Sequence, residues 1–187
     1  MELEIIGKLL IDLVKISIFD TLNNKQTLNK KEFLEKLPSF EKKAATFVTL
    51  TLDGKLRGCI GTLIPHNTLF DDLTSNAIKA AFEDPRFTPL TKEEFEKLKV
   101  EISLIGPITS ISYHNFEDLR GKITPNEHGV ILRLGDKQGT FLPQVWEDLP
   151  EYDQFLIHLF HKAGIDPNTV KELPEIFVYT VDKIIEP

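Results

Sequence analysis

Residues 44–63 read AATFVTLTLDGKLRGCIGTL and hold the clearest structural signal in the chain. Ala44 to Leu52 is rich in Val, Thr and Phe, which predicts a β-strand. Asp53-Gly54 predicts a two-residue hairpin turn, because both central residues of such a turn need positive φ. Lys55 to Leu63 is then the returning strand. The fold is therefore expected to start from an antiparallel hairpin.

Counting back from this turn predicts which residues of the two strands face each other. Leu50 falls opposite Arg57, and Val48 falls opposite Cys59. Since side chains alternate along a strand, Arg57 and Cys59 are expected on one face, beside Val48 and Leu50. A guanidinium among aliphatic side chains needs a carboxylate, a carbonyl or a ligand.

Two interpretations of this stretch stay open. In the structural one, Cys59 is a small buried hydrophobic residue and Arg57 forms a salt bridge with a surface acid. In the functional one, Arg57 favours the thiolate form of Cys59 and makes it a nucleophile. Gly58 and Gly61 flank the cysteine, and glycines inside a strand mark a bulge or a close approach of a ligand or backbone.

The rest of the chain alternates between helical and extended patterns. Thr68 with Asp71, and Thr91 with Glu94, are typical helix starts. Helices are predicted over 3–22, 30–37, from 68, over 91–98, 115–120 and 151–163, and further strands over 100–105, 130–134, 139–142 and 176–181. Because strands come in hairpins separated by helices, the pattern indicates an α+β protein with a mostly antiparallel sheet and flanking helices. No linker is evident, so residues 1–187 are expected to form a single domain.

Composition limits the classes of function. The 187 residues carry a net charge of −7, which argues against a protein that grips nucleic acid through its phosphates. Cys59 is the only cysteine, which excludes an internal disulfide and a cysteine-rich zinc site. The longest apolar stretch, 3–22, is interrupted by five charged residues, so neither a membrane span nor a signal peptide is expected. Cytoplasm is the expected location.

Three other residue groups are candidates for chemistry. His128, entering a strand, is the better candidate for a general base. His158 and His161 lie three apart on a helix, but without a third ligand they are interpreted as a plain solvated or half-buried pair, and no metal is assigned. Glu101 lies in an otherwise apolar strand and needs a cationic or donor partner if it is buried.

Two loop segments, 84–90 and 139–147, combine prolines, an arginine, amides and aromatic rings. This mixture is typical of small-molecule pockets. The structural alternative makes Arg86 a tether at a helix end, Trp146 a core residue and Glu101 a solvent-facing acid. The candidate ligand-binding residues are Arg57, Gly58, Gly61, Thr62, Arg86, Phe87, Thr140, Pro143 and Gln144.

Residues 56–62, LRGCIGT, resemble the signature of the AMMECR domain family, whose prokaryotic members are called AmmeMemoRadiSam system protein A. Further blocks resemble the family in the expected order, so the resemblance covers about 44–164. These blocks are AAF at 80–82 with DPRF at 84–87 and PL at 89–90, EIS at 101–103, HG at 128–129, GTFLPQVW at 139–146 and KAG at 162–164.

The resemblance implies a barrel-like antiparallel sheet with flanking helices, organised as two similar β/α halves. It also implies motif residues lining a cleft, and association with Memo-like and radical-SAM proteins, but no reaction or cofactor. The first hypothesis is an enzyme or enzyme component that binds a small anionic molecule, with Cys59, His128 and Glu101 as candidate catalytic residues. The alternative is a non-catalytic ligand- or protein-binding module. A role in nucleic-acid processing is disfavoured by the acidic charge balance.

Overall fold

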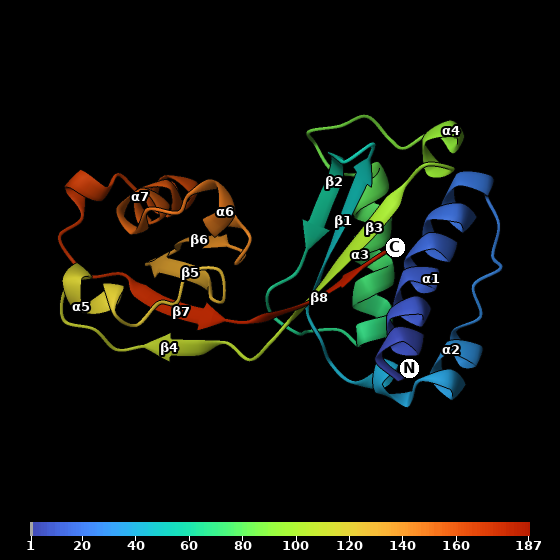
Figure 1. Cartoon of the computed structure of the whole chain (residues 1–187), viewed down its shortest axis with the longest axis horizontal. Helices are drawn as coiled ribbons and strands as arrows, with labels where there is room; N and C mark the ends of the chain where they lie inside the picture. Colours follow the sequence, from blue (N-terminus) through green and yellow to red (C-terminus); the bar gives the residue numbers. More distant parts are fainter. Residues whose placement is uncertain (1) are drawn as a thin grey trace. The chain divides into compact units, whose positions relative to one another are not determined.

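A computed structural model describes residues 2–187, with side chains described from residue 4 onward. The chain forms two compact units (Figure 1). Unit 1 runs to Ile105 and also takes in Asp182–Pro187, and unit 2 comprises Gly106–Val181. Each unit contains one four-stranded sheet together with helices. The α+β class predicted from the sequence is confirmed, while the assignment of one domain to residues 1–187 stays a prediction.

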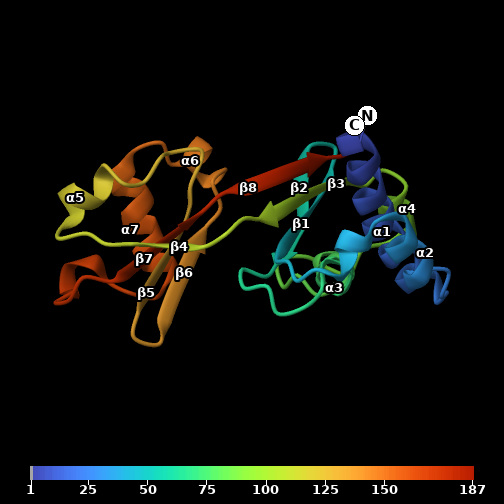
Figure 2. The ribbon, with the colours of Figure 1, turned by 90° about the horizontal axis from the view of Figure 1, so that it is seen from below.

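Unit 1 is built on the sheet order β2-β1-β3-β8, whose last strand comes from the end of the chain. Figure 2 shows α1 and α3 on one side of this sheet. The strands are β1 (Thr46–Leu52), β2 (Lys55–Gly61), β3 (Lys99–Ile105) and β8 (Val181–Ile185). The helices are α1 (Glu2–Asn23), α2 (Lys30–Lys36), α3 (Leu69–Phe82) and α4 (Lys92–Phe95), with a 3-10 turn at Pro38–Glu41.

Side-chain caps start these helices where the sequence predicts. The Thr68 hydroxyl accepts from the Asp71 N–H at the start of α3. Thr91 and Glu94 form a reciprocal capping box at α4. Each cap satisfies backbone N–H groups that have no partner inside the helix. α4 is only one turn long and lies in the segment between α3 and β3. The capping box therefore holds a large part of this segment in place.

The β1–β2 hairpin has the predicted turn but a different register. Asp53 and Gly54 both have positive φ, at 49° and 74°. Leu52 faces Lys55 as expected, but the register then shifts, and Leu50 faces Gly58. Arg57 is the extra residue of this β-bulge, which puts every later residue of β2 one position away from its predicted partner.

The core of unit 1 lies between the sheet and helices α1 and α3. Val48 and Leu50 of β1 and Ile102 of β3 are fully buried there. Gly58 allows β2 to approach α3 closely, because a Cβ at this position would lie 2.1 Å from the Ala80 carbonyl oxygen. Gly58, where β2 approaches α3, directly follows the bulged residue Arg57.

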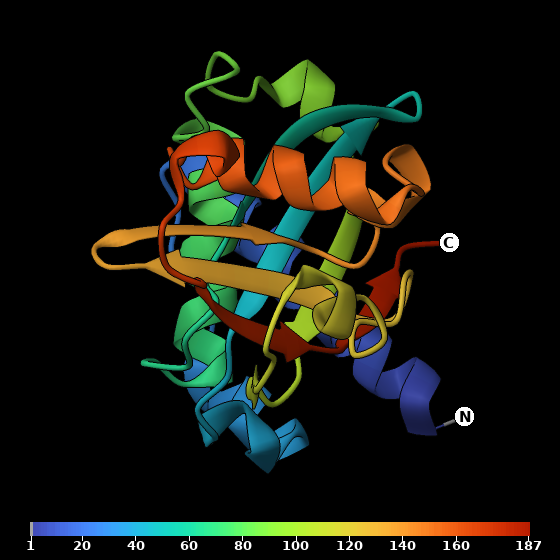
Figure 3. The ribbon, with the colours of Figure 1, turned by 90° about the vertical axis from the view of Figure 1, so that its left-hand side faces the viewer.

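Unit 2 has the sheet order β4-β7-β5-β6. Figure 3 shows α7 running beside this sheet, next to β6. Its core is mainly aliphatic and includes the Trp146 ring stacked on Phe155, with 3.6 Å between the ring centroids. Its elements are β4 (Thr109–Ile111), α5 (Phe116–Arg120), β5 (Gly129–Leu134), β6 (Lys137–Phe141), α6 (Val145–Asp148), α7 (Tyr152–Lys162), a 3-10 turn at Pro167–Thr169 and β7 (Glu175–Tyr179).

The barrel-like sheet implied by the family resemblance needs correcting, because the described strands form two open four-stranded sheets and no closed barrel. Over residues 2–187 each sheet keeps two edge strands, β2 and β8 in unit 1 and β4 and β6 in unit 2. Helices cover the apolar face in unit 1, so that face is buried without closing the sheet. Within the same residues, every helix is too short or too polar to pass through a membrane.

Candidate functional site on the Cys59 face

The bulge decides which side chains surround Cys59. Cys59 faces Thr49, and Thr49 in turn faces Glu101 on β3. Because side chains alternate, these three lie on the face opposite the buried Val48 and Leu50. We call this the Cys59 face of unit 1. The prediction that Cys59 lies beside Val48 and Leu50 is wrong, because the count from the turn did not include the extra residue.

Arg57 is buried and held by other parts of unit 1. Its Nε and Nη2 donate to the Glu94 carboxylate at 2.8 and 3.0 Å, and Nη2 also donates to the Thr88 carbonyl at 2.8 Å. Its guanidinium lies 5.6 Å from the centre of the Phe87 ring. The Arg57 guanidinium lowers the pKa of Glu94 against the opposing effect of burial. These contacts match the structural interpretation of Arg57, a salt bridge with an acid.

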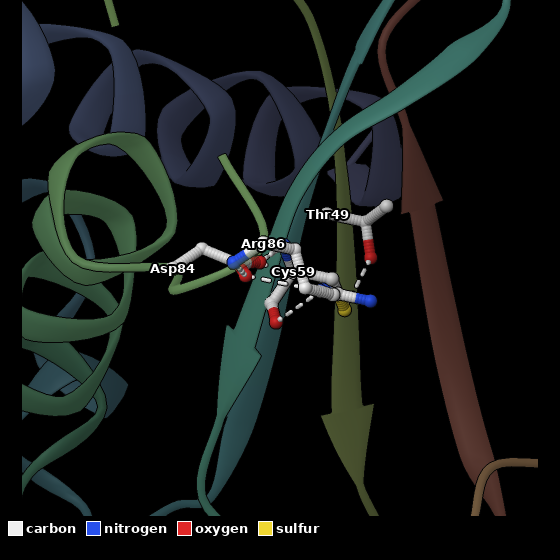
Figure 4. Close-up of polar contacts among 4 residues, drawn as sticks. All are labelled: Thr49, Cys59, Asp84 and Arg86. Atoms are coloured by element: carbon white, nitrogen blue, oxygen red, sulfur yellow. Dashed lines mark hydrogen bonds and ion pairs between the residues drawn. The ribbon is translucent and has the colours of Figure 1, made fainter. Parts of the chain in front are cut away.

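Asp84 and Arg86 together cap the edge of the sheet at Cys59 (Figure 4). β2 is an edge strand, so the backbone groups of Cys59 point away from the sheet. The Cys59 N–H donates to Asp84 Oδ2 at 2.9 Å, and Arg86 Nη2 donates to the Cys59 carbonyl at 3.3 Å. Two side chains of one loop therefore replace the missing neighbouring strand.

Asp84 also fixes the guanidinium of Arg86. Arg86 Nε and Nη2 donate to the two carboxylate oxygens at 2.9 and 2.7 Å, a bidentate pair. The Arg86 guanidinium lowers the pKa of Asp84 well below its ordinary value, against the effect of burial, and the Cys59 and Arg86 N–H groups lower it further. The Asp84 side chain is 2% exposed and that of Arg86 53%, so a buried acid presents a cation to solvent.

The cation close to the thiol is Arg86. Hydrogen bonding to Asp84 raises the pKa of Arg86, partly offset by burial, and the negative charges of Asp84 and of ionised Cys59 add to this. In Figure 4 the Arg86 side chain runs along β2 past the Cys59 carbonyl. The cation that contacts Cys59 is therefore Arg86, and not Arg57 as the sequence predicted.

A polar row crosses the Cys59 face from β2 to β8. The Cys59 sulfur and the Thr49 hydroxyl are 3.3 Å apart, and either atom can be the donor. On the next strand, Glu101 Oε1 lies 3.7 Å from the Lys183 ammonium. Ser103, two residues beyond Glu101, is on the same face and is buried. Glu101 therefore has the cationic partner that its place in an apolar strand requires.

Three further candidate residues stabilise the hairpin. A Cβ on Gly61 would lie 2.2 Å from the Phe47 ring, so this ring covers the glycine. The Thr62 hydroxyl donates to Asp72 at 2.6 Å, tying the end of β2 to α3. With Gly58 against Ala80, these contacts give Gly58, Gly61 and Thr62 a packing role in unit 1.

The remaining candidates belong to unit 2. His128 Nδ1 accepts from the Thr124 N–H at 3.1 Å, which leaves Nε2 as the protonated nitrogen of the neutral ring. The Thr140 hydroxyl donates to the Val130 carbonyl at 3.0 Å, and Gln144 begins α6. Pro143 is buried. Neutral His128 can therefore donate a hydrogen bond through Nε2. Its Nδ1 already accepts from Thr124, so His128 is poorly placed for the general-base role predicted from the sequence.

Comparison with known proteins gives the chain a family. The model of the AMMECR1 family matches residues 11–184, a range that contains LRGCIGT, most of unit 1 and all of unit 2. The chain belongs to the AMMECR1 family. A protein of Methanosarcina barkeri is 36% identical over 173 residues, which cover 90% of this chain and 84% of that protein. A protein of Aquifex aeolicus is 31% identical over 170 residues, 87% of this chain and 83% of that protein.

A solved structure supports the fold of this AMMECR1 protein. The crystal structure of an uncharacterized protein from Pyrococcus horikoshii matches with a TM-score of 0.84 and 31% sequence identity. The match covers 95% of this chain and 89% of that chain. This chain thus shares the fold of that protein. The chemistry has to be argued from the residues of the site.

Sequence reasoning missed three residues that shape the Cys59 face. Asp84 stood in a motif already singled out, but its spacing gave no sign that it would reach the Cys59 N–H. Thr49 became a neighbour of Cys59 only through the bulge. Lys183 lies on a strand that was not predicted, so the partner of Glu101 was unknown. Within residues 2–187, no three or more His, Cys, Asp or Glu side chains are grouped as a metal site.

Proposed function

We propose that the Cys59 face of this AMMECR1 protein binds a small anionic molecule, held by Arg86 and placed against the thiol of Cys59. The observation that supports this is the guanidinium of Arg86, which is held by the buried Asp84, is half exposed and contacts the Cys59 carbonyl. A guanidinium fixed before binding loses little side-chain entropy when it takes up an anion. The Asp84 clamp therefore favours recognition of a ligand.

In the enzymatic version of this proposal, Cys59 is the nucleophile. Arg86 stabilises the thiolate, which is the reactive form of cysteine. Glu101 lies on the same face with Thr49 between it and Cys59, so it is the candidate proton acceptor by way of a bridging group such as the Thr49 hydroxyl. His128 is less suited to this role, because its Nδ1 accepts from Thr124.

A non-catalytic binding module is the second candidate, and one observation favours it. The Cys59 sulfur contacts a hydroxyl, and in residues 2–187 it makes no hydrogen bond with an imidazole. A cysteine without a paired base is a weaker nucleophile than one beside a histidine. In this version binding survives Cys59→Ser and is lost in Arg86→Ala.

The proposal extends to partners and location. Memo-like and radical-SAM proteins are the proposed partners and cytoplasm the proposed location, on the strength of the family resemblance and of the single cysteine. Co-purification of the tagged chain with these two proteins from cells tests the extension. Capture of neither protein would remove the partner proposal and leave the ligand proposal intact.

The rate of Cys59 alkylation tests the Arg86 proposal directly, since the chain has a single thiol. Arg86→Ala is expected to slow alkylation by iodoacetamide several-fold at neutral pH, because the thiolate loses its cation. Arg133→Ala is the matched control, because Arg133 is also a half-exposed arginine paired with an acid, Glu175. Mass spectrometry should find a co-purifying anion with wild type and Arg133→Ala but not with Arg86→Ala. Equal alkylation rates and equal ligand content in all three proteins would refute the proposal.

A further inference from the structure

Glu101 has hydrogen-bonding capacity that the described part of the chain leaves unused. Its side chain is 24% exposed, and its nearest cation, Lys183, is 3.7 Å away. This distance is too long for a hydrogen bond. Within residues 2–187 the carboxylate accepts no hydrogen bond. A largely buried carboxylate in this state is stabilised when a donor arrives.

Arg86 has unused capacity of the opposite sign at the other end of the polar row. Its Nε and Nη2 are bonded to Asp84, and Nη2 also to the Cys59 carbonyl. Its Nη1 makes no hydrogen bond with the described residues. The guanidinium therefore keeps a half-exposed donor that is directed by the Asp84 clamp.

The thiol of Cys59 and the hydroxyl of Thr49 lie between these two ends. Cys59, Thr49 and Glu101 face one another on three neighbouring strands. Two inter-strand spacings separate Cys59 from Glu101, about 10 Å in total. A third unused group lies beside Glu101 on the same face: the Ser103 hydroxyl, which is buried and has no hydrogen-bond partner among the described residues.

The charges of this face cancel in pairs. Asp84 balances Arg86, and Lys183 balances Glu101. Because the charges balance, the face does not favour a ligand of high net charge. The free donor of Arg86 suits an anionic end of a ligand, and the carboxylate of Glu101 suits a cationic end. A ligand with a single anionic group would bind Arg86 and leave the Glu101 carboxylate without a hydrogen-bond donor. A dianion would place its second negative group close to the Glu101 carboxylate, which would repel it.

We propose that the Cys59 face takes a linear zwitterion, an ω-amino carboxylate. Its carboxylate accepts from Arg86 Nη1, and its ammonium donates to Glu101. The chain between them passes over Cys59 and Thr49. This inference rests on the proposed function: it keeps the anionic group held by Arg86 and adds that the same ligand carries an ammonium at its other end.

Protection of Cys59 from iodoacetamide tests this ligand class on the wild-type protein. Three six-carbon probes are compared: 6-aminohexanoate, hexanoate and adipate. We expect 6-aminohexanoate to protect at about tenfold lower concentration than hexanoate, as one added charge-assisted hydrogen bond would give. Adipate should protect least. Glu101→Gln should remove the advantage of 6-aminohexanoate over hexanoate, whereas Glu175→Gln, a glutamate in a surface ion pair, should keep it.

Each other outcome overturns the inference in a distinct way. Equal protection by hexanoate and 6-aminohexanoate means that an anion site exists but that Glu101 recognises nothing, so only the zwitterion inference falls. Strongest protection by adipate means that Lys183 is the second contact, which also contradicts it. No protection by any probe refutes the ligand class. The proposed function is then decided by the alkylation rate and ligand content of Arg86→Ala, which use none of these probes.

Discussion

At the scale of single residues, Arg57 and Arg86 have different roles, although the sequence made both of them candidate ligand-binding residues. Arg57 is buried and bidentate to Glu94, so it holds α4 and the preceding loop against β2. Arg86 is half exposed and bidentate to a buried acid, so it presents charge to solvent. The sequence could not separate these roles. Glu94, the partner of Arg57, is far away in the sequence, and Asp84 reaches Arg86 only because the loop turns back on itself. The two arginines differ in that the guanidinium of Arg57 is buried and that of Arg86 is half exposed.

Alanine substitutions should show that each arginine is also a partner of an acid in the fold. Arg57→Ala is expected to lower the free energy of unfolding by about 2 kcal/mol, less than a fully buried pair because Glu94 is partly exposed. Arg86→Ala should cost at least as much, because it leaves the buried Asp84 carboxylate without its cation. Urea denaturation followed by circular dichroism measures both values. No loss of stability in Arg57→Ala would contradict the assignment of Arg57 to structure.

At the scale of elements, the β1–β2 hairpin shows how far local sequence determines a site. Asp53-Gly54 predicted the turn, and both residues have the positive φ that such a turn needs. The bulge was not predictable from spacing, because its cause lies in α3, where Ala80 meets Gly58. β8 was missed for a similar reason: five residues near the chain end become a strand only by pairing with β3. Turns follow local chemistry, whereas register and edges follow tertiary contacts.

A methyl group on Gly58 tests the contact between β2 and α3. Gly58→Ala would place Cβ 2.1 Å from the Ala80 carbonyl oxygen, a backbone atom that moves only with the helix. We expect a loss of about 3 kcal/mol in unfolding free energy, typical of overpacking. Gly121→Ala is the control, since its Cβ would approach no atom closer than 3.9 Å. If both variants unfold at the same urea concentration, the close approach at Gly58 does not determine the register.

At the scale of the whole molecule, the chain divides into two cores that composition alone did not reveal. Unit 1 is completed by residues from both ends of the chain, and unit 2 is a single stretch between them. Each core is continuous within its own unit. The motif residues divide between the units in the same way, with Arg57, Cys59 and Arg86 in unit 1 and His128 and Gln144 in unit 2. A blockwise motif pattern along the sequence could not show this division.

Acid should affect the two units differently. In unit 1, the pKa values of Asp84 and Glu94 are lowered mainly by their hydrogen bonds to Arg86 and Arg57. A carboxyl whose pKa is lower in the folded state stabilises the fold above its ordinary pKa, near 4, and this stabilisation is lost as the pH falls further. The lowered carboxyls of unit 2, Asp118 and Glu175, lie in surface pairs that solvent screens.

Hydrogen exchange followed by mass spectrometry can resolve this difference along the chain. When the pH falls from about 5 to about 2.5, amides of β1, β2 and α3 should lose protection before those of β5 and β7, because Asp84 of unit 1 is a buried acid whose pKa is lowered in the folded state and the unfolded chain takes up its proton first. Asp84→Asn should reduce the acid sensitivity of unit 1, since the variant has no carboxyl to protonate at that position. Simultaneous loss of protection in both units would mean that they unfold as one cooperative domain, the organisation expected from the sequence. Earlier loss in unit 2 would contradict the assignment of acid sensitivity to Asp84 and Glu94.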